Sequence, residues 1–356
     1  MRRHKKKKKS TTINNLNDDV LIIIFKYLSF SQRLLMERVC VRWSIIAQQS
    51  WGGVTTMKID NNQIYGMSKD FHSEELKTVF NTLLMRCGRH LNTLTITNSI
   101  IDSSILPIIR FNCCHLTQVD LIFKTNAIEH FVKPFGKMKK LKSCKITNVK
   151  SLFARDCLIS LPNGIETIHM EVPNSLITFS SRLLLSSLSS VFIKFNSLRS
   201  LTLRGYRFSG LLINAISQCQ TLTFVDLQNS VIEKIDDLSN LTNLKYLNVS
   251  KVERITNSFL ILVADKCKKL EYLDVSYCKR VNDDGVKEII KHCLNLEQLK
   301  IAWTSVTSGV IISAVNLTKY RRGCPILHLY PGPWMTFKHP QLKYRIYYSY
   351  LKIIYR

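Results

Sequence analysis

Apolar and polar residues alternate and then change period within residues 270–293, which read LEYLDVSYCKRVNDDGVKEIIKHC. The alternation places Leu273 and Val275 on one side of an extended chain, as in a half-buried strand. The opposite side carries Tyr272, Asp274 and Ser276. After a run of turn and helix-capping residues, apolar positions recur at helical spacing, at Val286, Ile289, Ile290 and Cys293. A unit of about two dozen residues cannot bury both apolar faces alone, so the pattern predicts neighbours of the same kind.

The strand part of this pattern occurs nine times along the chain. Written L-x-x-L-x-L, with V, I, M or C also allowed, it starts at Leu91, Leu116, Leu141, Ile165, Leu198, Leu222, Leu244, Leu270 and Leu296. Consecutive starts are 22 to 26 residues apart, except for one step of 33 residues that begins at Ile165. A degenerate tenth strand is predicted at residues 324–330. Stacked units of this kind predict an α/β fold, a curved solenoid with a parallel sheet on its concave face and helices outside.

The cysteines follow the same repeat. The chain has eleven of them and no C-x-x-C pair. Those that lie two to four residues before a repeat start are Cys87, Cys113, Cys114, Cys219, Cys267 and Cys293. A recurring place beside a leucine pattern predicts buried structural thiols instead of a zinc site or a disulfide framework. We therefore expect no metal and no cofactor.

The repeated form resembles the leucine-rich repeat family, in particular its cysteine-containing subclass. In that subclass LxxLxL is followed by Cys or Asn, a helix, and a Cys just before the next repeat. The match is strong at residues 222–301 and moderate at 91–121. It is weak at 141–197, where the interrupting residues are Pro162, Gly164 and Pro173. In the long step, the serine-rich segment SSRLLLSSLSSVF predicts either a longer helix or an insertion.

Alternate strand positions of such a sheet face the concave side and are candidates for contact with a target protein. In three consecutive repeats the position before the second leucine is aromatic, at Phe224, Tyr246 and Tyr272. The polar positions beside this row are Asp226, Asn248, Asp274 and Lys300. Rigid aromatic side chains anchor interfaces, so we predict a recognition strip; the alternative is a structural row, because aromatics are also good strand formers. Trp303 either extends the strip or caps the core.

Residues 13–51 carry two apolar sets at helical spacing. The first set is Leu16, Val20, Leu21, Ile24, Phe25 and Leu28. The second set begins with Val39, Cys40 and Trp43. About forty residues with this much apolar surface are too few for an independent core, so the segment is predicted to need a partner.

This segment resembles the F-box, whose pattern is LP-x-E-x-L-x-x-I-F-x-x-L, a variable turn, and VC-x-x-W. The residues that match are Leu16, Leu21, Ile24, Phe25, Leu28, Val39, Cys40 and Trp43, with Trp51 at the usual closing position. The resemblance implies that the eight matching residues before Trp51 bind the Skp-type adaptor. The alternative is an ordinary helical cap for the solenoid.

Two departures from the F-box pattern are visible. Asn17 stands where the family has proline, and we expect it to cap a helix in its place. The pair Gln32-Arg33 stands where Asp-Leu is common. We expect this second departure to weaken adaptor contact unless Leu34 and Leu35 compensate.

Composition adds a strong positive charge. The chain has 356 residues, with 51 Lys and Arg against 25 Asp and Glu, a formal net charge of +26, which attracts acidic proteins and polyanions. Seven of the cations lie in the opening MRRHKKKKK, which predicts a nuclear localisation signal, a tether to a membrane surface or a solvated tail. The sequence contains no signal-like start and no apolar run long enough to span a bilayer, so we expect a protein of the nucleus, the cytoplasm or both.

These features divide the chain into five parts. They are a basic tail (1–12), the F-box (13–52), a linker or first capping repeat (53–90), the leucine-rich repeats (91–330) and a basic aromatic tail (331–356). The last of these contains no acidic residue. We expect it either to cover the open end of the solenoid or to fold into the concave face and modify the choice of target.

The two resemblances together imply a non-catalytic substrate-recognition subunit of an SCF-type ubiquitin ligase. The F-box would bind the Skp-type adaptor, which leads to a cullin scaffold and its RING protein. The repeats would hold an unknown target, acidic or phosphorylated, for ubiquitination and proteasomal degradation. No catalytic residue is expected, because the chain contains no phosphate loop, G-x-S-x-G, H-E-x-x-H or G-x-G-x-x-G.

The alternative function is that of a basic repeat scaffold without any role in ubiquitin transfer. Such a scaffold would bind acidic proteins, nucleic acid or a membrane surface through its charge. Nucleic acid is disfavoured because no nucleic-acid module is present and the lysine run is not interleaved with aromatic residues.

Overall fold

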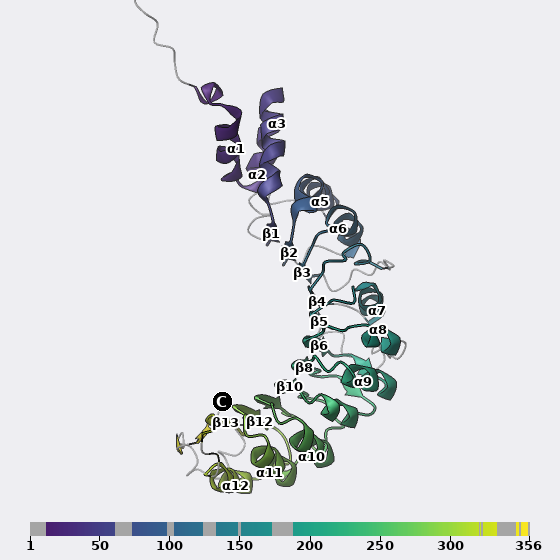
Figure 1. Ribbon diagram of the computed structural model, residues 1–356, viewed down its shortest axis with the longest axis vertical. Coiled ribbons are helices and arrows are strands. Elements are labelled where there is room, and N and C mark those ends of the chain that lie inside the picture. The colour runs from purple at the N-terminus through teal and green to yellow at the C-terminus, as the bar shows by residue number, and fades with distance from the viewer. Residues whose placement is uncertain are drawn as a thin grey trace, which may run out of the picture.

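The computed structural model describes residues 12–60, 73–97, 103–123, 133–148, 151–172, 188–319, 321, 323–332, 347–348 and 350–354. It is a curved stack of strand and helix units that follows three N-terminal helices (Figure 1). The strands line the inner side of the curve, and the helices of the repeats lie along the outer side (Figure 1). The basic run at residues 1–11 and the tail segment 333–346 lie outside the described residues.

The N-terminal helical unit spans residues 13–53. Its elements are the 3-10 helix η1 (Ile13–Asn15), α1 (Asp18–Lys26), α2 (Phe30–Met36), α3 (Val41–Ser50) and the 3-10 helix η2 (Trp51–Gly53). The side chain of Asn17 accepts a hydrogen bond from the backbone N–H of Val20 at 2.9 Å. Asn17 therefore caps α1, as expected for a residue that replaces the proline of the F-box pattern. A capping box between Ser29 and Gln32 starts α2 in the same way.

One sheet runs the length of the solenoid. In the described part of the chain it has 13 strands, in the order β1-β2-β3-β4-β5-β6-β8-β10-β11-β12-β13-β15-β14. Their bounds are β1 (Thr56–Ile59), β2 (Thr93–Ile96), β3 (Gln118–Ile122), β4 (Ser143–Thr147), β5 (Thr167–Glu171), β6 (Ser200–Arg204), β8 (Phe224–Asp226), β10 (Tyr246–Asn248), β11 (Tyr272–Asp274), β12 (Gln298–Lys300), β13 (Leu327–Tyr330), β14 (Tyr347–Tyr348) and β15 (Leu351–Ile353). Neighbours pair in parallel, except that β14 pairs antiparallel with β15. A small second sheet joins β7 (Arg207–Phe208) to β9 (Val231–Ile232).

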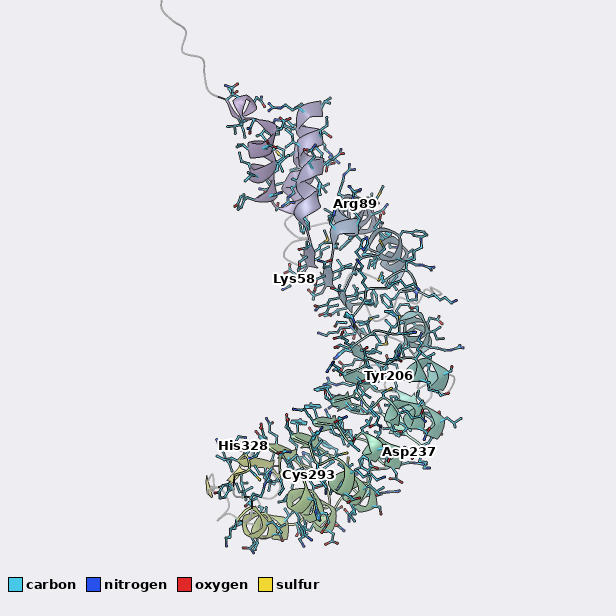
Figure 2. All side chains as sticks on the ribbon, viewed as in Figure 1. Lys58, Arg89, Tyr206, Asp237, Cys293 and His328 are labelled. Atoms are coloured by element: carbon cyan, nitrogen blue, oxygen red, sulfur yellow. The ribbon has the colours of Figure 1, made fainter. Side chains whose placement is uncertain are left out.

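The connections between strands carry the helices of the convex side. They are α5 (Ser73–Cys87), α6 (Leu106–Asn112), α7 (Ser151–Ser160), α8 (Ser189–Ile193), α9 (Gly210–Ser217), α10 (Asn257–Lys266), α11 (Asp283–His292) and α12 (Gly309–Thr318). The described connections also contain the 3-10 helices η3 (Gly88–His90), η4 (Ser103–Ile105) and η8 (Asp236–Asn240). The 22-residue repeat that starts at Leu222 contains η8 in place of an α-helix, since it is the shortest of the repeats. Asp237 of η8 lies on the convex side, whereas Lys58 and His328, near the two ends of the sheet, lie on the concave side (Figure 2).

The strands confirm the predicted repeat. Each of the nine predicted starts is followed, two residues later, by the first residue of a strand, and β13 falls within the predicted tenth strand. The described part of the weakly matching segment contains β4, α7 and β5, and Pro162 and Gly164 lie in the turn between α7 and β5 without interrupting either element. Pro173 lies outside the described residues, and the serine-rich segment is described only from Leu188, where it forms the short α8. The pairing of β1 with β2 makes β1 and α5 the first unit of the solenoid.

In most repeats, a residue just after the end of the strand has a left-handed backbone conformation. The fifth residue after the strand start has φ between 59° and 78° at Asn148, Gly205, Asn229, Lys251, Tyr277 and Trp303. Glycine and asparagine adopt this conformation at little cost, but lysine, tyrosine and tryptophan do so rarely. Because the strands are parallel, these residues lie along one edge of the sheet, at the carboxyl ends of the strands.

The interior contains most of the cysteines as free thiols. Eight are buried, among them Cys87, Cys267 and Cys278, whose S–H groups donate to backbone carbonyls at 3.2 to 3.5 Å. Burial raises the pKa of the Cys87 thiol to about 12, and that of Cys267 to about 12. The buried thiols are therefore protonated at neutral pH and pack as small apolar side chains.

The C-terminal end of the sheet is covered by the end of the chain. β15 pairs in parallel with β13, and its side chains Leu351 and Ile353 are buried. Nearby, the buried Arg321 donates to the backbone carbonyls of Leu294 and Leu296. The described end of the basic aromatic tail thus shields the edge of the last repeat, which is one of the two roles considered for it.

Candidate functional site

The inner face of α1 forms the small core of the N-terminal helical unit. Leu21 and Phe25 are 0% and 1% exposed and pack against Ile46 and Ala47 of α3. This corrects the prediction that Leu21 and Phe25 bind the adaptor directly, since neither has exposed surface with which to touch a partner. They hold the helices of the unit together.

The other predicted adaptor residues lie nearer the surface. Ile24, Leu28 and Trp43 are partly buried against the same small core, and the Trp43 ring meets the Phe25 ring edge-on at 5.3 Å. The indole N–H of Trp43 donates to the side-chain oxygen of Asn14 at 3.1 Å. The exposed members of the predicted set are Leu16, Val39 and Cys40. Contact of these six residues with an adaptor stays a prediction.

An apolar surface that the sequence prediction missed lies on the outer faces of α1 and α3. Val20 and Ile23 of α1 and the C-cap residue Tyr27 follow one another at helical spacing and are exposed, Tyr27 to 87%. On α3, Val41 and Ile45 are exposed one turn apart. The two helices pack on each other, so their apolar stripes belong to one small unit. Exposed apolar groups concentrated in this way are typical of a protein-binding surface.

The departure from the F-box pattern at Gln32-Arg33 has a structural role. Gln32 completes the capping box of α2. The buried guanidinium of Arg33 donates to the backbone carbonyls of Leu28 and Ser50 and lies 5.2 Å from the centre of the Trp51 ring. Leu34 packs against the solenoid core, so of the two leucines expected to compensate only Leu35 is exposed.

Trp51 joins the helical unit to the repeats. Its buried side chain belongs to the core of the solenoid and not to the small core of the helical unit. Its indole N–H donates to the Glu37 carboxylate at 2.9 Å, and the other carboxylate oxygen accepts from Arg86 of α5 at 2.8 Å. Packed side chains and an ion pair therefore connect the exposed apolar surface to the first repeat.

The three predicted aromatics form a stacked column on the concave face. The ring centres of Phe224 and Tyr246 are 4.0 Å apart, and those of Tyr246 and Tyr272 are 4.1 Å apart, with the planes within 10° of parallel. Neighbouring strands, about 4.8 Å apart, hold the rings face to face, so their edges are left for a partner. The ammonium of Lys300 lies 5.1 Å from the centre of the Tyr272 ring at one end of the column. We call Phe224, Tyr246 and Tyr272 the aromatic column.

The polar residues beside the aromatic column are buried, which corrects their prediction as contact residues. Asp226, Asn248 and Asp274 each accept a hydrogen bond from the backbone N–H two residues later, at 2.9 to 3.1 Å. Asp226 also accepts from Asn248. These side chains turn back onto their own chain as the strand ends, so they fix the turns instead of facing a target. Of the predicted set on this row, Lys300 keeps part of its side chain at the surface.

A charged stretch outside the predicted recognition strip lies on β4, β5 and β6. Arg204 forms an ion pair with the buried Asp226 at 2.7 Å and approaches Glu171 at 3.8 Å. The pKa of His169 is lowered, mainly by burial and to a smaller extent by the positive charges of Lys145 and Arg204. His169 is therefore largely neutral at pH 7, and this part of the concave face has both donors and acceptors.

Trp303 is exposed and does not cap the core. Its ring stacks on that of Tyr277 at 5.9 Å, beyond the end of β12. Among the described residues, no three His, Cys, Asp or Glu side chains are grouped as a metal site would require. None of the described helices is long and apolar enough to cross a membrane.

Comparison with models of protein families identifies two domains. An F-box domain matches residues 13–51 and a Leucine Rich repeat matches residues 266–289. A search of curated proteins finds no match. Among solved structures, the chain is similar to an internalin (inlF) from Listeria monocytogenes, with 14% identity and a TM-score of 0.43 over 85% of this chain and 92% of that one. It is also similar to a leucine-rich repeat protein of Leptospira interrogans, with 12% identity and a TM-score of 0.41 over 67% of this chain and 61% of that one.

These domains agree with the two kinds of surface described above. An F-box implies a Skp-type adaptor as partner, and leucine-rich repeats imply binding of a protein. The combination is typical of non-catalytic adaptor or receptor proteins and supports a role in substrate recognition for SCF-type ligases in general. The chain thus matches an F-box and leucine-rich repeat protein, with an F-box at residues 13–51 and the repeats behind it.

Proposed function

We propose that this chain is the substrate-recognition subunit of an SCF-type ubiquitin ligase. The exposed apolar surface of α1 and α3 binds the Skp-type adaptor, which connects the chain to a cullin scaffold and a RING protein. The repeats hold a target for ubiquitination and proteasomal degradation. The observation that carries the proposal is the joint at Trp51, which ties an apolar binding surface to a concave recognition surface through packed side chains.

The chain's contribution to the reaction is positioning. A target lysine that is held beside the ubiquitin-carrying enzyme reacts with the bound ubiquitin almost as in a unimolecular reaction. No bimolecular encounter between target and enzyme is then needed. A packed joint restricts the distance and angle between target and adaptor more than a flexible linker does. The buried, protonated thiols have no part in this transfer, and the ubiquitin-carrying thiol belongs to the conjugating enzyme.

An affinity purification of the full chain beside an Ile23→Arg, Tyr27→Arg variant tests the proposal. Both side chains are exposed, so the substitutions change the surface without disturbing the core. We expect the adaptor and cullin to copurify with the wild type and to be absent from the variant sample. The target proteins should copurify with both. Absence of adaptor and cullin from the wild-type sample would contradict the proposal and favour a basic repeat scaffold.

Substitution of the aromatic column is expected to weaken binding of the target without changing binding of the adaptor. In a Phe224→Ala, Tyr246→Ala, Tyr272→Ala variant, three half-buried rings that anchor a contact are lost, each worth roughly 1 to 2 kcal/mol. The proteins captured by the repeats should fall by about tenfold or more, measured by quantitative mass spectrometry.

The matched control replaces the same strand position in earlier repeats, as Gln118→Ala, Ser143→Ala, Thr167→Ala. These residues pair in the same sheet but carry small or polar side chains. Capture should be unchanged in this control. An equal loss in both variants, or none in either, would make the aromatic column purely structural.

A further inference from the structure

A second aromatic row lies at the edge of the sheet, outside the aromatic column. It is formed by the left-handed residues of three successive repeats, Lys251, Tyr277 and Trp303. The rings of Tyr277 and Trp303 stack at 5.9 Å and 19°, and the ammonium of Lys251 lies 5.1 Å from the centre of the Tyr277 ring. We call these three residues the edge row.

The backbone holds the edge row in place. The N–H of Lys251 donates to the carbonyl of Ser276 at 2.9 Å, and the N–H of Tyr277 donates to the carbonyl of Ala302 at 2.7 Å. These bonds continue the parallel ladder past the ends of the strands, so the side chains follow one another at the spacing of the sheet. The row is a preformed surface one residue wide in each repeat.

The residue types of the edge row are not those that its backbone favours. Earlier repeats have Asn148, Gly205 and Asn229 at this position, which accept positive φ readily. Tyr277 and Trp303 adopt φ of 66° and 61° and remain 47% and 48% exposed, so they gain little from burial in return. A strained conformation that exposes two large aromatic side chains points to a contact with another molecule.

The charges around the edge row favour an acidic partner. Lys251, Lys279 and Arg280 are exposed, and within the described chain none of the three forms an ion pair. The acidic residues of the neighbouring strand ends, Asp226 and Asp274, are buried and bonded to backbone. Lys279 and Arg280 follow Tyr277 by two and three residues, and Glu253 and Asp284 are the exposed acidic residues of the same connections. The three cations outnumber these two carboxylates, so the connections can attract carboxylates of a partner, and the paired rings can stack on one of its aromatic side chains.

We propose that the edge row binds an extended acidic segment of the target, with an aromatic residue on Tyr277 and Trp303 and carboxylates beside Lys251, Lys279 and Arg280. This inference rests on the proposed function, because it names the chemical class of target that the repeats hold. A row one residue wide suits an extended segment better than a broad folded face. The aromatic column then contacts a different part of the same target.

A Tyr277→Asn, Trp303→Asn variant of the full chain tests the proposal. Asparagine is the residue found at the equivalent position in two earlier repeats, and the net charge is unchanged. The probe is a fluorescein-labelled copolymer of glutamate and tyrosine, measured by anisotropy. We expect the variant to bind it roughly tenfold more weakly than the wild type, the loss of two aromatic anchors. Its melting temperature should equal or exceed that of the wild type, because asparagine relieves the backbone.

Three further measurements make the result specific. Polyglutamate should bind both proteins alike, since it offers no aromatic side chain. A Leu211→Asn, Ile261→Asn control, which removes exposed apolar groups from convex helices, should bind the copolymer as the wild type does. A Lys251→Gln, Lys279→Gln variant should weaken binding of both polymers, because it removes the cations.

Several outcomes would overturn the inference. Equal copolymer affinity for the wild type and the asparagine variant means that the edge row contacts no acidic segment. A lower melting temperature with unchanged binding makes the row structural. A selective loss of binding to vesicles of phosphatidylserine and phosphatidylcholine, with the copolymer unaffected, assigns the row to membranes. Adaptor binding should be the same in both proteins; its absence from the wild type would contradict the proposed function and leave the test of the edge row intact.

Discussion

Replacing Ile23 and Tyr27 by arginine is expected to weaken binding of the Skp-type adaptor by more than about a hundredfold, the loss of two anchor residues plus the cost of placing charge in an apolar contact. Ile23 lies on the outer face of α1, Tyr27 is the C-cap residue of that helix, and Tyr27 is among the most exposed apolar side chains described. Titration of the purified full chain with purified adaptor by calorimetry measures the change. Circular dichroism and the melting temperature should match those of the wild type.

Two comparison variants make this result interpretable. A Leu211→Arg, Ile312→Arg variant places the same charges on exposed apolar positions of α9 and α12, and it should bind the adaptor normally. A Phe25→Arg variant should lose adaptor binding together with helical signal, because Phe25 is in the core of the unit. Normal binding by the Ile23→Arg, Tyr27→Arg variant would show that the adaptor uses another face.

Replacing Trp51 by alanine is expected to destabilise the N-terminal helical unit by about 3 to 5 kcal/mol, the usual range for a buried tryptophan. The substitution removes a ring whose centre lies 5.8 Å from that of Phe30. The same ring lies under the guanidinium of Arg33. It also removes the donor to Glu37. Hydrogen exchange should therefore increase throughout α1 to α3, whereas the amides of β10 to β12 stay protected, since distant repeats depend only on their neighbours.

The matched control is Trp303→Ala, which removes an exposed tryptophan of the same chain. We expect its effect on the free energy of unfolding to be below about 1 kcal/mol. Urea unfolding followed by circular dichroism compares the two variants. Equal stability of Trp51→Ala and the wild type would mean that the helical unit and the repeats are not joined through this side chain.

The repeats could be predicted because their spacing follows directly from burial. In each strand, Leu273 and its equivalents must face the core. In the helix that follows, the apolar residues must recur at helical spacing in order to pack on the same core. The positions of Asp226, Asn248 and Asp274 were misjudged because alternation assumes that the strand continues. The strands at these residues are only three residues long, and the chain turns at once. The local signal was present, since Asp or Asn near a strand end commonly bonds to the backbone two residues later.

The orientation of α1 could not be predicted from period alone. The run DVLIIIF places apolar side chains on both faces of the helix, so two stripes compete for the core. The structure puts Leu21 and Phe25 inside and leaves Ile23 outside. A helix that is apolar on both faces indicates a second contact surface. Once the face buried in the core is known, the other face is the candidate for this contact.

The joint and the edge row depend on contacts between distant residues. Glu37 and Arg86 are 49 positions apart, and one sequence gives no reason to pair them. Tyr277 and Trp303 lie on equivalent positions of neighbouring repeats, but their stacking depends on a left-handed turn that aromatic residues rarely adopt. Sequence periodicity places such residues in register, and the turn conformation decides which way their side chains face.

We propose that one chain brings a target held by the repeats to a ubiquitin ligase held by the F-box. The decisive measurement is ubiquitin transfer to the proteins that copurify with the chain, reconstituted with adaptor, cullin, RING protein and conjugating enzyme. We expect polyubiquitin on those proteins with the wild type, and none with the Ile23→Arg, Tyr27→Arg variant, although the same proteins remain bound. Bound proteins that stay unmodified while the wild-type chain carries adaptor and cullin would contradict it.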